Sequence, residues 1–267
     1  MSEEESPDKI DRKKEREKLK EDPRDFEHRL HNAKMSFLNY MARKVLPGGF
    51  WSGNRLQPGA GAAAPESATV SGGTLRSQLD ANGKIRLHLT FDDGPDPGST
   101  PDLLNLLAKR GVIATFFFIG ANAKKHAALV KEVQNAGQII GNHSMNHLFL
   151  PVQATKKIES EIDEANQILE EITGERPSLF RPPFGLIDKR GAELLAARRM
   201  SPVYWGAVAD DWQYIGEEAV TRRILKQLPR EELIVLHEGP HLGKQTVNAA
   251  ALLIDRCLEL GFSFDSI

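Results

Sequence analysis

The sequence predicts an α/β fold in which about seven parallel strands form a closed or nearly closed barrel. From Lys84 onward, short apolar runs typical of strands alternate with longer stretches of helical periodicity, which is the pattern of repeated strand–helix units. Four of the helical stretches are followed by a glycine, the residue that most often ends a helix: Gly111, Gly137, Gly174 and Gly261. Seven strands with helices between them favour a barrel over an open sheet.

The apolar runs give the strand candidates in chain order: Ile85–Phe91, Val112–Ile119, Gln138–Gly141, Leu179–Arg181, Val203–Trp205, Leu233–His237 and Phe262–Phe264. The stretches between them give the helix candidates: Thr100–Arg110, Asn122–Ala136, Ala154–Thr173, Asp188–Arg198, Glu217–Gln227 and Lys244–Leu260. Strands that are joined through helices run parallel, so their carboxyl ends are expected to share one rim.

The first 83 residues differ in composition from the rest of the chain. Ser2–Arg24 has mixed charge and few apolar residues, so it buries too little surface to offset the entropy of ordering. Pro58–Gly73 is rich in glycine, alanine, proline and serine, as linkers are. We therefore expect an N-terminal helical or disordered extension over residues 1–57, a linker over 58–83 and one catalytic domain over 84–267.

Apolar residues recur at helical spacing from Phe26 to Val45, and basic residues fall elsewhere on the helical wheel. Docking on the folded domain or on a second copy is the more ordinary use of such a helix. The alternative is weak contact with a membrane surface through residues 26–46, which would suit a lipid-linked sugar. No hydrophobic stretch near the start has the length of a secretory core or a membrane span, so we expect a cytoplasmic protein, with membrane association as the alternative.

Composition narrows the range of partners. The chain has 267 residues, 40% of them hydrophobic, which is enough for a substantial core. Its formal net charge is −2 and the predicted domain shows no basic stripe with aromatic residues, so we expect no nucleic-acid partner. The single cysteine, Cys257, excludes an internal disulfide and lies in an apolar helical pattern typical of a core residue. The sequence leaves the oligomeric state open.

Two segments of the chain combine carboxylates and imidazoles. Asp92 and Asp93 come at the carboxyl end of the first predicted strand, where α/β folds place their chemistry. His143 and His147 are four residues apart, and on a helical turn this spacing would put both imidazoles on one face. Two histidines and one carboxylate hold a divalent metal with open positions for water and substrate. Zinc is the expected metal, with cobalt, nickel or manganese as alternatives.

Adjacent residues of a strand point to opposite sides, so the two aspartates are expected to do different jobs, one binding metal and the other taking a proton. An Asp-Asp-Gly-Pro segment by itself is typical of a solvated turn. Here three further segments, Arg181–Gly185, Ala209–Trp212 and Leu233–Glu238, each follow or close a predicted strand. Together these segments indicate one site for hydrolysis.

In chain order, five segments resemble the five motifs of the polysaccharide deacetylase family, which is carbohydrate esterase family four and shares the nodulation-type deacetylase homology domain. They are Thr90–Pro95, Gly141–His147, Arg181–Gly185, Ala209–Trp212 and Leu233–Glu238. The resemblance covers about residues 85–267, and Ala114–Gly120 adds a further match. It implies a distorted (β/α) barrel that removes an N-acetyl group from an amino sugar of an oligosaccharide or glycan.

The resemblance also implies a role for each residue at the rim. The metal ligands would be Asp93, His143 and His147, and Asp92 would be the general base for the bound water. Arg181 would orient Asp92. His237 would be the general acid that protonates the departing amine, and Asp211 would be hydrogen-bonded to it. A carboxylate neighbour would raise the pKa of that histidine above its unperturbed value and keep it protonated near neutral pH.

Four residues are implied as substrate contacts. The backbone amide of Phe184 would help to hold the oxyanion, and Trp212, Val235 and Leu236 would form the wall of the acetyl pocket. Two positions depart from the family's usual residues, with Val208 where an aspartate is common and Val235 where leucine is common. These two departures affect the prediction of the substrate more than the prediction of the reaction.

Three functions therefore remain in view. The leading one is metal-dependent removal of an N-acetyl group from an amino-sugar oligosaccharide or glycan, with release of acetate. The second is deacylation or deformylation of a lipid-linked sugar, or hydrolysis of another non-peptide amide. The third is a catalytically silent carbohydrate-binding homologue, whose signature would be loss of Asp92 or of a metal ligand, and the sequence retains all of them.

Overall fold

The computed structural model describes residues 79–267. The extension expected over residues 1–57, with its amphipathic helix at 26–46, and residues 58–78 of the expected linker lie outside the described residues. Within residues 79–267 the structure contains no helix that is both long and apolar enough to cross a membrane.

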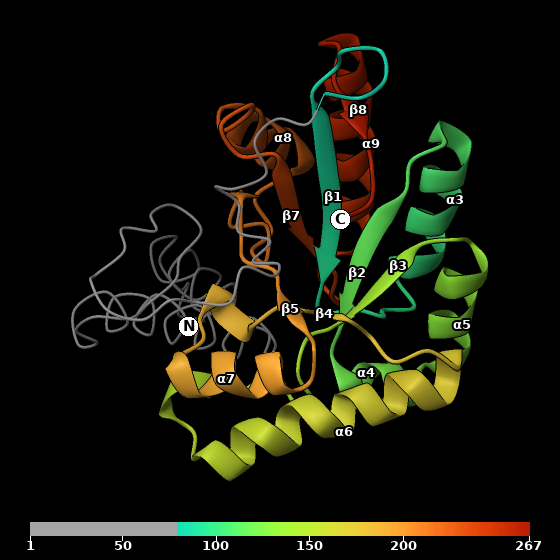
Figure 1. Ribbon diagram of the computed structural model, residues 1–267. Coiled ribbons are helices and arrows are strands. Elements are labelled where there is room, and N and C mark those ends of the chain that lie inside the picture. The colour runs from blue at the N-terminus through green and yellow to red at the C-terminus, as the bar shows by residue number, and fades with distance from the viewer. Residues whose placement is uncertain (1–78) are drawn as a thin grey trace, which may run out of the picture. The chain divides into compact units, whose positions relative to one another are not determined.

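Seven parallel strands curl into a half-barrel, and an eighth short strand pairs in parallel with the first of them (Figure 1). In chain order the strands are β1 (Arg86–Asp92), β2 (Ala114–Phe118), β3 (Ile139–Asn142), β4 (Leu179–Phe180), β5 (Ser201–Pro202), β6 (Ala207–Val208), β7 (Leu233–His237) and β8 (Ser263–Phe264). Their order across the sheet is β5-β4-β3-β2-β1-β7-β6, and β8 pairs with the beginning of β1. The predicted class of fold is confirmed. Hydrogen bonds do not close the barrel, because no pairing joins β5 and β6 in the described part of the chain.

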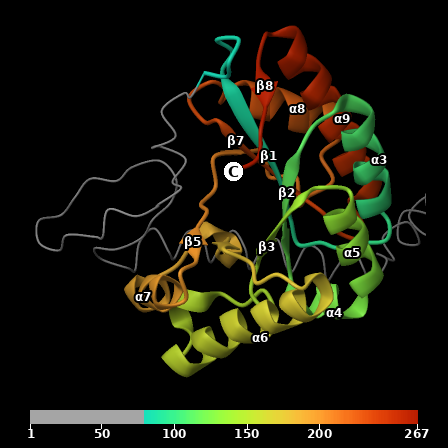
Figure 2. The same ribbon diagram turned by 45° about the vertical axis from the view of Figure 1, so that its right-hand side comes forward.

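Helices cover the outer side of this sheet (Figure 2). They are α3 (Thr100–Arg110), α4 (Gly120–Lys125), α5 (Ala127–Asn135), α6 (Thr155–Thr173), α7 (Lys189–Ala197), α8 (Glu217–Leu225) and α9 (Gly243–Glu259), with short 3-10 turns η1 (Leu150–Val152) and η2 (Pro183–Gly185). Helix α9 packs against α3 and α8, and α6 packs against α4, α5 and α7. The predicted alternation of strands and helices therefore produces one continuous outer layer.

The glycines predicted to end helices do so. All four have a positive φ, between 63° at Gly111 and 87° at Gly261, a conformation that glycine adopts at no steric cost. The predicted helix Asn122–Ala136 is instead two helices, because the backbone leaves the helical region at His126 (φ −124°, ψ 46°).

The predicted strand Val203–Trp205 does not form as one unit. Val203 still donates its N–H to the carbonyl of Phe180 at 2.8 Å, but the strands assigned here are β5 before it and β6 after it. Residues 204–206 belong to neither strand, and the Gly206 backbone lies so close to the Leu233 carbonyl on β7 that a Cβ at this position would clash. Only a glycine allows this approach of the chain to β7 just before β6.

The two faces of β1 have different chemistry. Leu87, Leu89 and Phe91 belong to the large apolar cluster that the sheet shares with the helices. The alternate positions His88, Thr90 and Asp92 are buried and polar, and alternation along a strand puts them on the opposite, inner face. Polar groups thus line the interior of the half-barrel below the carboxyl ends of its strands.

Candidate active site

Three predicted metal ligands converge at the rim. Asp93 Oδ1 lies 3.4 Å from His143 Nε2 and 3.4 Å from His147 Nε2. One ligand atom from each of the three residues lies within 4.8 Å of the other two. Asp93 Oδ1 is buried and accepts no hydrogen bond, so its lone pairs remain available to a cation. The donor set of two imidazole nitrogens and one carboxylate oxygen fits a divalent transition metal.

The end of β1 separates the two aspartates. The strand ends at Asp92, and Asp93 takes a left-handed backbone conformation with φ 73°. The Asn122 side chain holds this turn by donating to the Asp93 carbonyl at 2.8 Å. The turn redirects Asp93 toward the histidines while Asp92 stays inside the barrel, which agrees with the expected division between the two carboxylates.

The helical turn expected at His143–His147 is not formed. This segment is a loop in which Ser144 (φ 63°) and His147 (φ 52°) are left-handed. Side chains supply its hydrogen bonds: Asn142 Oδ1 accepts from the Ser144 N–H at 2.7 Å, and Ser144 Oγ accepts from the His147 N–H at 3.0 Å. Such local side-chain bonds compete with helix formation, so the two imidazoles meet by a route other than helical spacing.

The protonation states of this cluster suit metal binding. His143 Nδ1–H donates to the Arg181 carbonyl at 2.7 Å, which leaves the Nε2 lone pair directed at the cluster. Burial lowers the pKa of His147 to about 4, so its imidazole is neutral at pH 7. Burial alone would raise the pKa of Asp93, but the neighbouring His147 and His143 outweigh it and hold that pKa well below its usual range. Neutral imidazoles and an ionised carboxylate are the forms that bind metal.

Asp92 has two oxygens with different surroundings. Oδ1 accepts from Arg181 Nη1 at 2.6 Å, and both side chains are fully buried. Oδ2 has no hydrogen-bond partner and lies 3.9 Å from His143 Nε2 and 3.9 Å from His237 Nε2. Arg181 Nη1 also donates to Thr90 Oγ1 at 2.7 Å, a contact that sequence reasoning did not anticipate. One oxygen of Asp92 is therefore held and the other faces the centre of the site.

His237 and Asp211 form a buried pair. His237 Nδ1–H donates to Asp211 Oδ1 at 2.9 Å, and the backbone N–H of His237 donates to Asp211 Oδ2 at 2.7 Å. Burial disfavours the charged imidazole, but the charge and hydrogen bond of Asp211 outweigh burial and raise the pKa of His237 to about 9. His237 is thus held protonated near neutral pH, as expected from the sequence.

Aromatic rings surround the two histidine groups. The ring of Trp212 lies 5.2 Å from that of His237, and the ring of Trp205, which was not predicted as a wall residue, lies 5.9 Å from it. The ring of Phe184 contacts that of His147 with centroids 4.6 Å apart, and the Phe184 backbone is left-handed (φ 62°). These rings pack against the imidazoles of His147 and His237.

The two expected aliphatic wall residues lie on different faces of β7. Val235 pairs with Thr90 and belongs to the cluster inside the barrel, together with Phe117 and Val203. Leu236 pairs with Phe91 and belongs to the cluster between sheet and helices. The structure brings Val235 to the same face as His237 and does not bring Leu236 there, because neighbouring strand residues alternate.

Two buried carboxylates beside the site escaped sequence reasoning. Glu238 accepts from Ser99 Oγ at 2.7 Å and from Thr100, and burial raises its pKa to about 7. In the sequence, only its position directly after His237 indicates that Glu238 lies near the site. Glu161, on α6, accepts from the Asn146 backbone N–H at 2.7 Å and from Asn146 Nδ2 at 2.8 Å. It thereby holds the loop between the two metal-site histidines, although its sequence position looks like an ordinary charged helix face.

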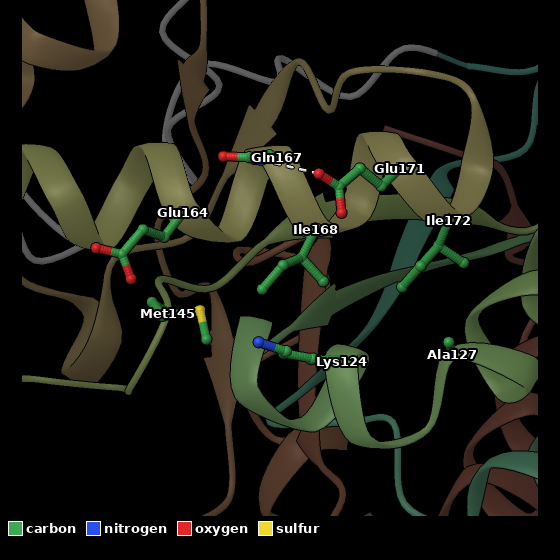
Figure 3. A pocket seen from close by; sticks show the side chains of 8 residues that line it. All are labelled: Lys124, Ala127, Met145, Glu164, Gln167, Ile168, Glu171 and Ile172. Atoms are coloured by element: carbon green, nitrogen blue, oxygen red, sulfur yellow. Dashed lines mark hydrogen bonds between the residues drawn. The ribbon is translucent and has the colours of Figure 1, made fainter.

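A separate surface cavity of about 330 Å³ lies between α6 and the α4–α5 segment (Figure 3). It is lined by Lys124, Ala127, Met145, Glu164, Gln167, Ile168, Glu171 and Ile172. Met145 comes from the loop between the two histidines, but none of the lining residues belongs to the predicted site. The cavity is therefore distinct from the cluster at the strand ends.

Comparisons with known proteins agree with this geometry. Residues 80–202 match the sequence family described as Polysaccharide deacetylase. A peptidoglycan-N-acetylglucosamine deacetylase of Bacillus cereus is 34% identical over 204 residues, covering 72% of this chain and 95% of the relative. A chitooligosaccharide deacetylase of Sinorhizobium fredii is 31% identical over 196 residues, covering 69% of this chain and 91% of the relative.

A solved structure gives the same result for the fold. The crystal structure of a peptidoglycan N-acetylglucosamine deacetylase, bound to 4-naphthalen-1-yl-N-oxidanyl-benzamide, superimposes with a TM-score of 0.65 at 31% identity. The superposition covers 68% of this chain and 86% of that chain. Fold and relatives together define a hydrolase that acts on N-acetyl amide bonds. The chain belongs to the polysaccharide deacetylase family, that is, to the family-four carbohydrate esterases.

Proposed function

We propose that this protein is a metal-dependent deacetylase that releases acetate from an N-acetylated amino sugar in an oligosaccharide or glycan. The observation that carries the proposal is the position of Asp92 Oδ2, which has no hydrogen-bond partner and lies 3.9 Å from both a metal-site histidine and His237. The proposed base Asp92 thus lies between the proposed metal ligands and the proposed acid His237. The named activities of the relatives, on peptidoglycan N-acetylglucosamine and on chitooligosaccharide, support the class of substrate.

Attack on the amide begins with Asp92. Asp93, His143 and His147 would hold a divalent ion, zinc in our proposal, which would lower the pKa of water and stabilise the developing negative charge on the amide oxygen. Asp92 Oδ2 accepts the proton of the attacking water, because Arg181 occupies Oδ1 and fixes the direction of the carboxylate. The backbone amide of Phe184 is proposed as a further donor to the oxyanion.

Expulsion of the amine depends on His237. When the carbon–nitrogen bond breaks, the nitrogen needs a proton, because an amide anion is a poor leaving group. His237 Nε2–H supplies it, while Asp211 holds Nδ1–H and stabilises the imidazolium. Trp212 and Trp205, whose rings are stacked 5.7 Å apart, and Val235 are proposed to enclose the acetyl methyl group.

The proposal is tested by measuring acetate release from chitooligosaccharides, peptidoglycan fragments and lipid-linked sugars, each with and without a chelator. We expect release from at least one N-acetylated glycan, its loss with chelator, and its recovery when zinc, or cobalt, nickel or manganese, is returned. Chelator-resistant release would overturn the metal requirement. A metal-loaded protein that releases no acetate from any of these substrates would overturn the proposed activity.

The same panel separates the alternative substrate. Val208 lies in β6, where the family commonly has an aspartate, and Val235 lies inside the barrel, where the family commonly has the larger leucine. These two differences leave room for another acyl group or a lipid-linked sugar. Release from lipid-linked sugars alone would favour that alternative. A silent homologue is not favoured, because the ligand set, base and acid are all present and in mutual reach.

A further inference from the structure

Two adjacent residues of α9 contact the His237–Asp211 pair from behind. Gln245 and Thr246 are each 1% exposed and lie near the beginning of the helix. Neither residue lies in one of the five motif segments, and the proposed mechanism gives neither of them a role. Buried polar side chains in a helix normally need partners elsewhere, so the destination of their hydrogen bonds is informative.

All the hydrogen bonds of the Gln245 side chain end on one loop, residues 211–216. Nε2 donates to the carbonyls of Asp211 and Gln213, both at 2.9 Å. Oε1 accepts from the N–H groups of Ile215 and Gly216, both at 2.7 Å. A primary amide has two donor hydrogens and two acceptor lone pairs, so this set uses its full capacity.

Thr246 holds the other partner of the pair. Its hydroxyl donates to the His237 carbonyl at 2.7 Å, and a longer contact of 3.3 Å leads to the Leu242 carbonyl within its own helix. One helical turn therefore fixes the backbone of Asp211 through Gln245 and the backbone of His237 through Thr246. The 2.9 Å bond between Asp211 Oδ1 and His237 Nδ1 lies between these two attachments.

We propose that Gln245 and Thr246 are positioning residues that set the direction of the His237 Nε2–H proton. Residues 211–216 form no strand or helix, and Gln245 bonds backbone groups of four of them, which regular structure would otherwise satisfy. The orientation of Asp211 decides where the imidazole points, and a displacement of about 1 Å can cost roughly a hundredfold in rate. This inference rests on the proposed function, because it needs His237 to act as the acid.

The test compares two substrates that differ in their need for an acid. Deacetylation of a chitooligosaccharide releases an amine that must be protonated, whereas 4-nitrophenyl acetate releases a phenolate that leaves without a proton. Gln245→Leu removes all four contacts at similar volume, and Thr246→Val removes only the hydroxyl. We expect each variant to lower kcat on the chitooligosaccharide roughly 10- to 100-fold, with KM within about threefold and with aryl-ester hydrolysis within about threefold of wild type.

A matched control is present in the chain. Gln227, in the turn after α8, also bonds the backbone of a strand, donating to the Val208 carbonyl at 2.8 Å and accepting from the Val208 N–H at 3.3 Å, yet neither of these bonds reaches Asp211 or His237. Gln227→Leu should leave the ratio of amide to ester hydrolysis unchanged. Gln245→Glu keeps the acceptors and loses the donors to Asp211 and Gln213, so it should lower the ratio even if Gln245→Leu does not fold.

Three results would overturn the inference. Equal loss of amide and ester hydrolysis would show that the variants damage the whole site rather than the proton transfer. An unchanged ratio in Thr246→Val and Gln245→Glu would show that neither residue positions the acid. A wild-type protein that hydrolyses the ester but no N-acetylated sugar would instead overturn the proposed substrate, and the inference with it. The rate of 4-nitrophenyl acetate hydrolysis by Asp92→Asn is subtracted from every ester rate, because it measures hydrolysis that does not depend on the proposed base.

Discussion

At the scale of single residues, the proposed chemistry depends on the different surroundings of the two Asp92 carboxylate oxygens. Arg181 binds one oxygen at 2.6 Å, and the other oxygen is buried without a hydrogen-bond partner. A buried carboxylate oxygen with no donor is costly, so its persistence is best explained by a ligand or water that uses it during turnover. In the proposed mechanism, Oδ1 of Asp92 fixes the carboxylate through Arg181 and Oδ2 accepts the proton.

Asp92→Asn should keep the metal and lower kcat by two or more orders of magnitude, because the amide cannot accept a proton but can still accept a hydrogen bond from Arg181. The measurements are kcat on an N-acetylated glycan and metal content by elemental analysis. Thermal unfolding should confirm that the variant is folded at the assay temperature. Undiminished turnover would remove Asp92 from the role of base.

His143→Ala and His237→Ala should have opposite effects on metal content. The first variant loses a ligand atom that lies 3.4 Å from Asp93 Oδ1, so it should lose metal and activity together. The second should retain metal and lose amide hydrolysis, because only proton delivery to the amine is removed. If metal content instead follows His237, the assignments of ligand and acid are reversed.

The pH dependence of kcat/KM should show an alkaline limb that belongs to His237. Its pKa is raised to about 9, and an acid must be protonated to act, so activity is present below this pKa and is lost as pH rises through it. A bound cation repels the imidazolium and moves the limb to lower pH. Asp211→Asn removes the charge that raises the pKa and should move the limb lower still. A limb that does not respond to this substitution would exclude His237 as its origin.

At the scale of elements, helix ends were predictable and the metal-site loop was not. Glycine adopts positive φ without steric cost and therefore commonly ends a helix, and the structure places the glycines after four helical stretches at positive φ. The conformation of residues 143–147 depends on bonds from Asn142, Ser144 and Glu161, which no local periodicity encodes. The sequence predicted that His143 and His147 meet through helical spacing, and the structure brings them together with Asp93 through a loop instead.

Glu161→Ala should weaken metal binding although Glu161 is not a ligand. Its carboxylate is fully buried and makes two hydrogen bonds to Asn146, so its loss frees a loop whose left-handed residues need support. Outer partners of metal ligands typically contribute about 10- to 100-fold in affinity. Competition with a chromogenic chelator measures the effect. Lys157→Met, which removes the other partner of Glu161 and leaves Asn146 in place, is the control and should bind metal normally.

At the scale of the whole molecule, the sequence predicted the architecture because alternating strands and helices carry repeated local signals. It also placed the candidate site residues at strand ends, and the structure brings them together there. It could not predict the contacts of α9 with these residues, because the bonds of Gln245 and Thr246 join residues 9 to 34 positions apart and depend on their packing. Nor could it predict that β5 and β6 stay unpaired, since strand pairing depends on long-range packing that local periodicity does not encode.

Removing metal should lower thermal stability without unfolding the described domain. The ligands lie in loops at the rim, and the main apolar cluster lies between the sheet and its helices. A ligand that binds only the native state at a hundred times its Kd adds about 2.7 kcal/mol, so a chelator should lower Tm by on the order of 5–10 °C. Circular dichroism should show retained secondary structure. His143→Ala should not respond to chelator, and a response from it would indicate a second binding site.

Arg181 and Asp92 sit together with no solvent contact at either side chain. Replacing one partner with an apolar residue would strand a single charge in the barrel, which costs about 3–5 kcal/mol. That is a large part of the roughly 5–15 kcal/mol by which domains are stable. Gradual loss of catalysis through this pair would thus proceed by polar replacements such as Asp92→Asn, which keep a hydrogen-bond acceptor for Arg181, whereas an apolar replacement of one partner requires replacement of the other.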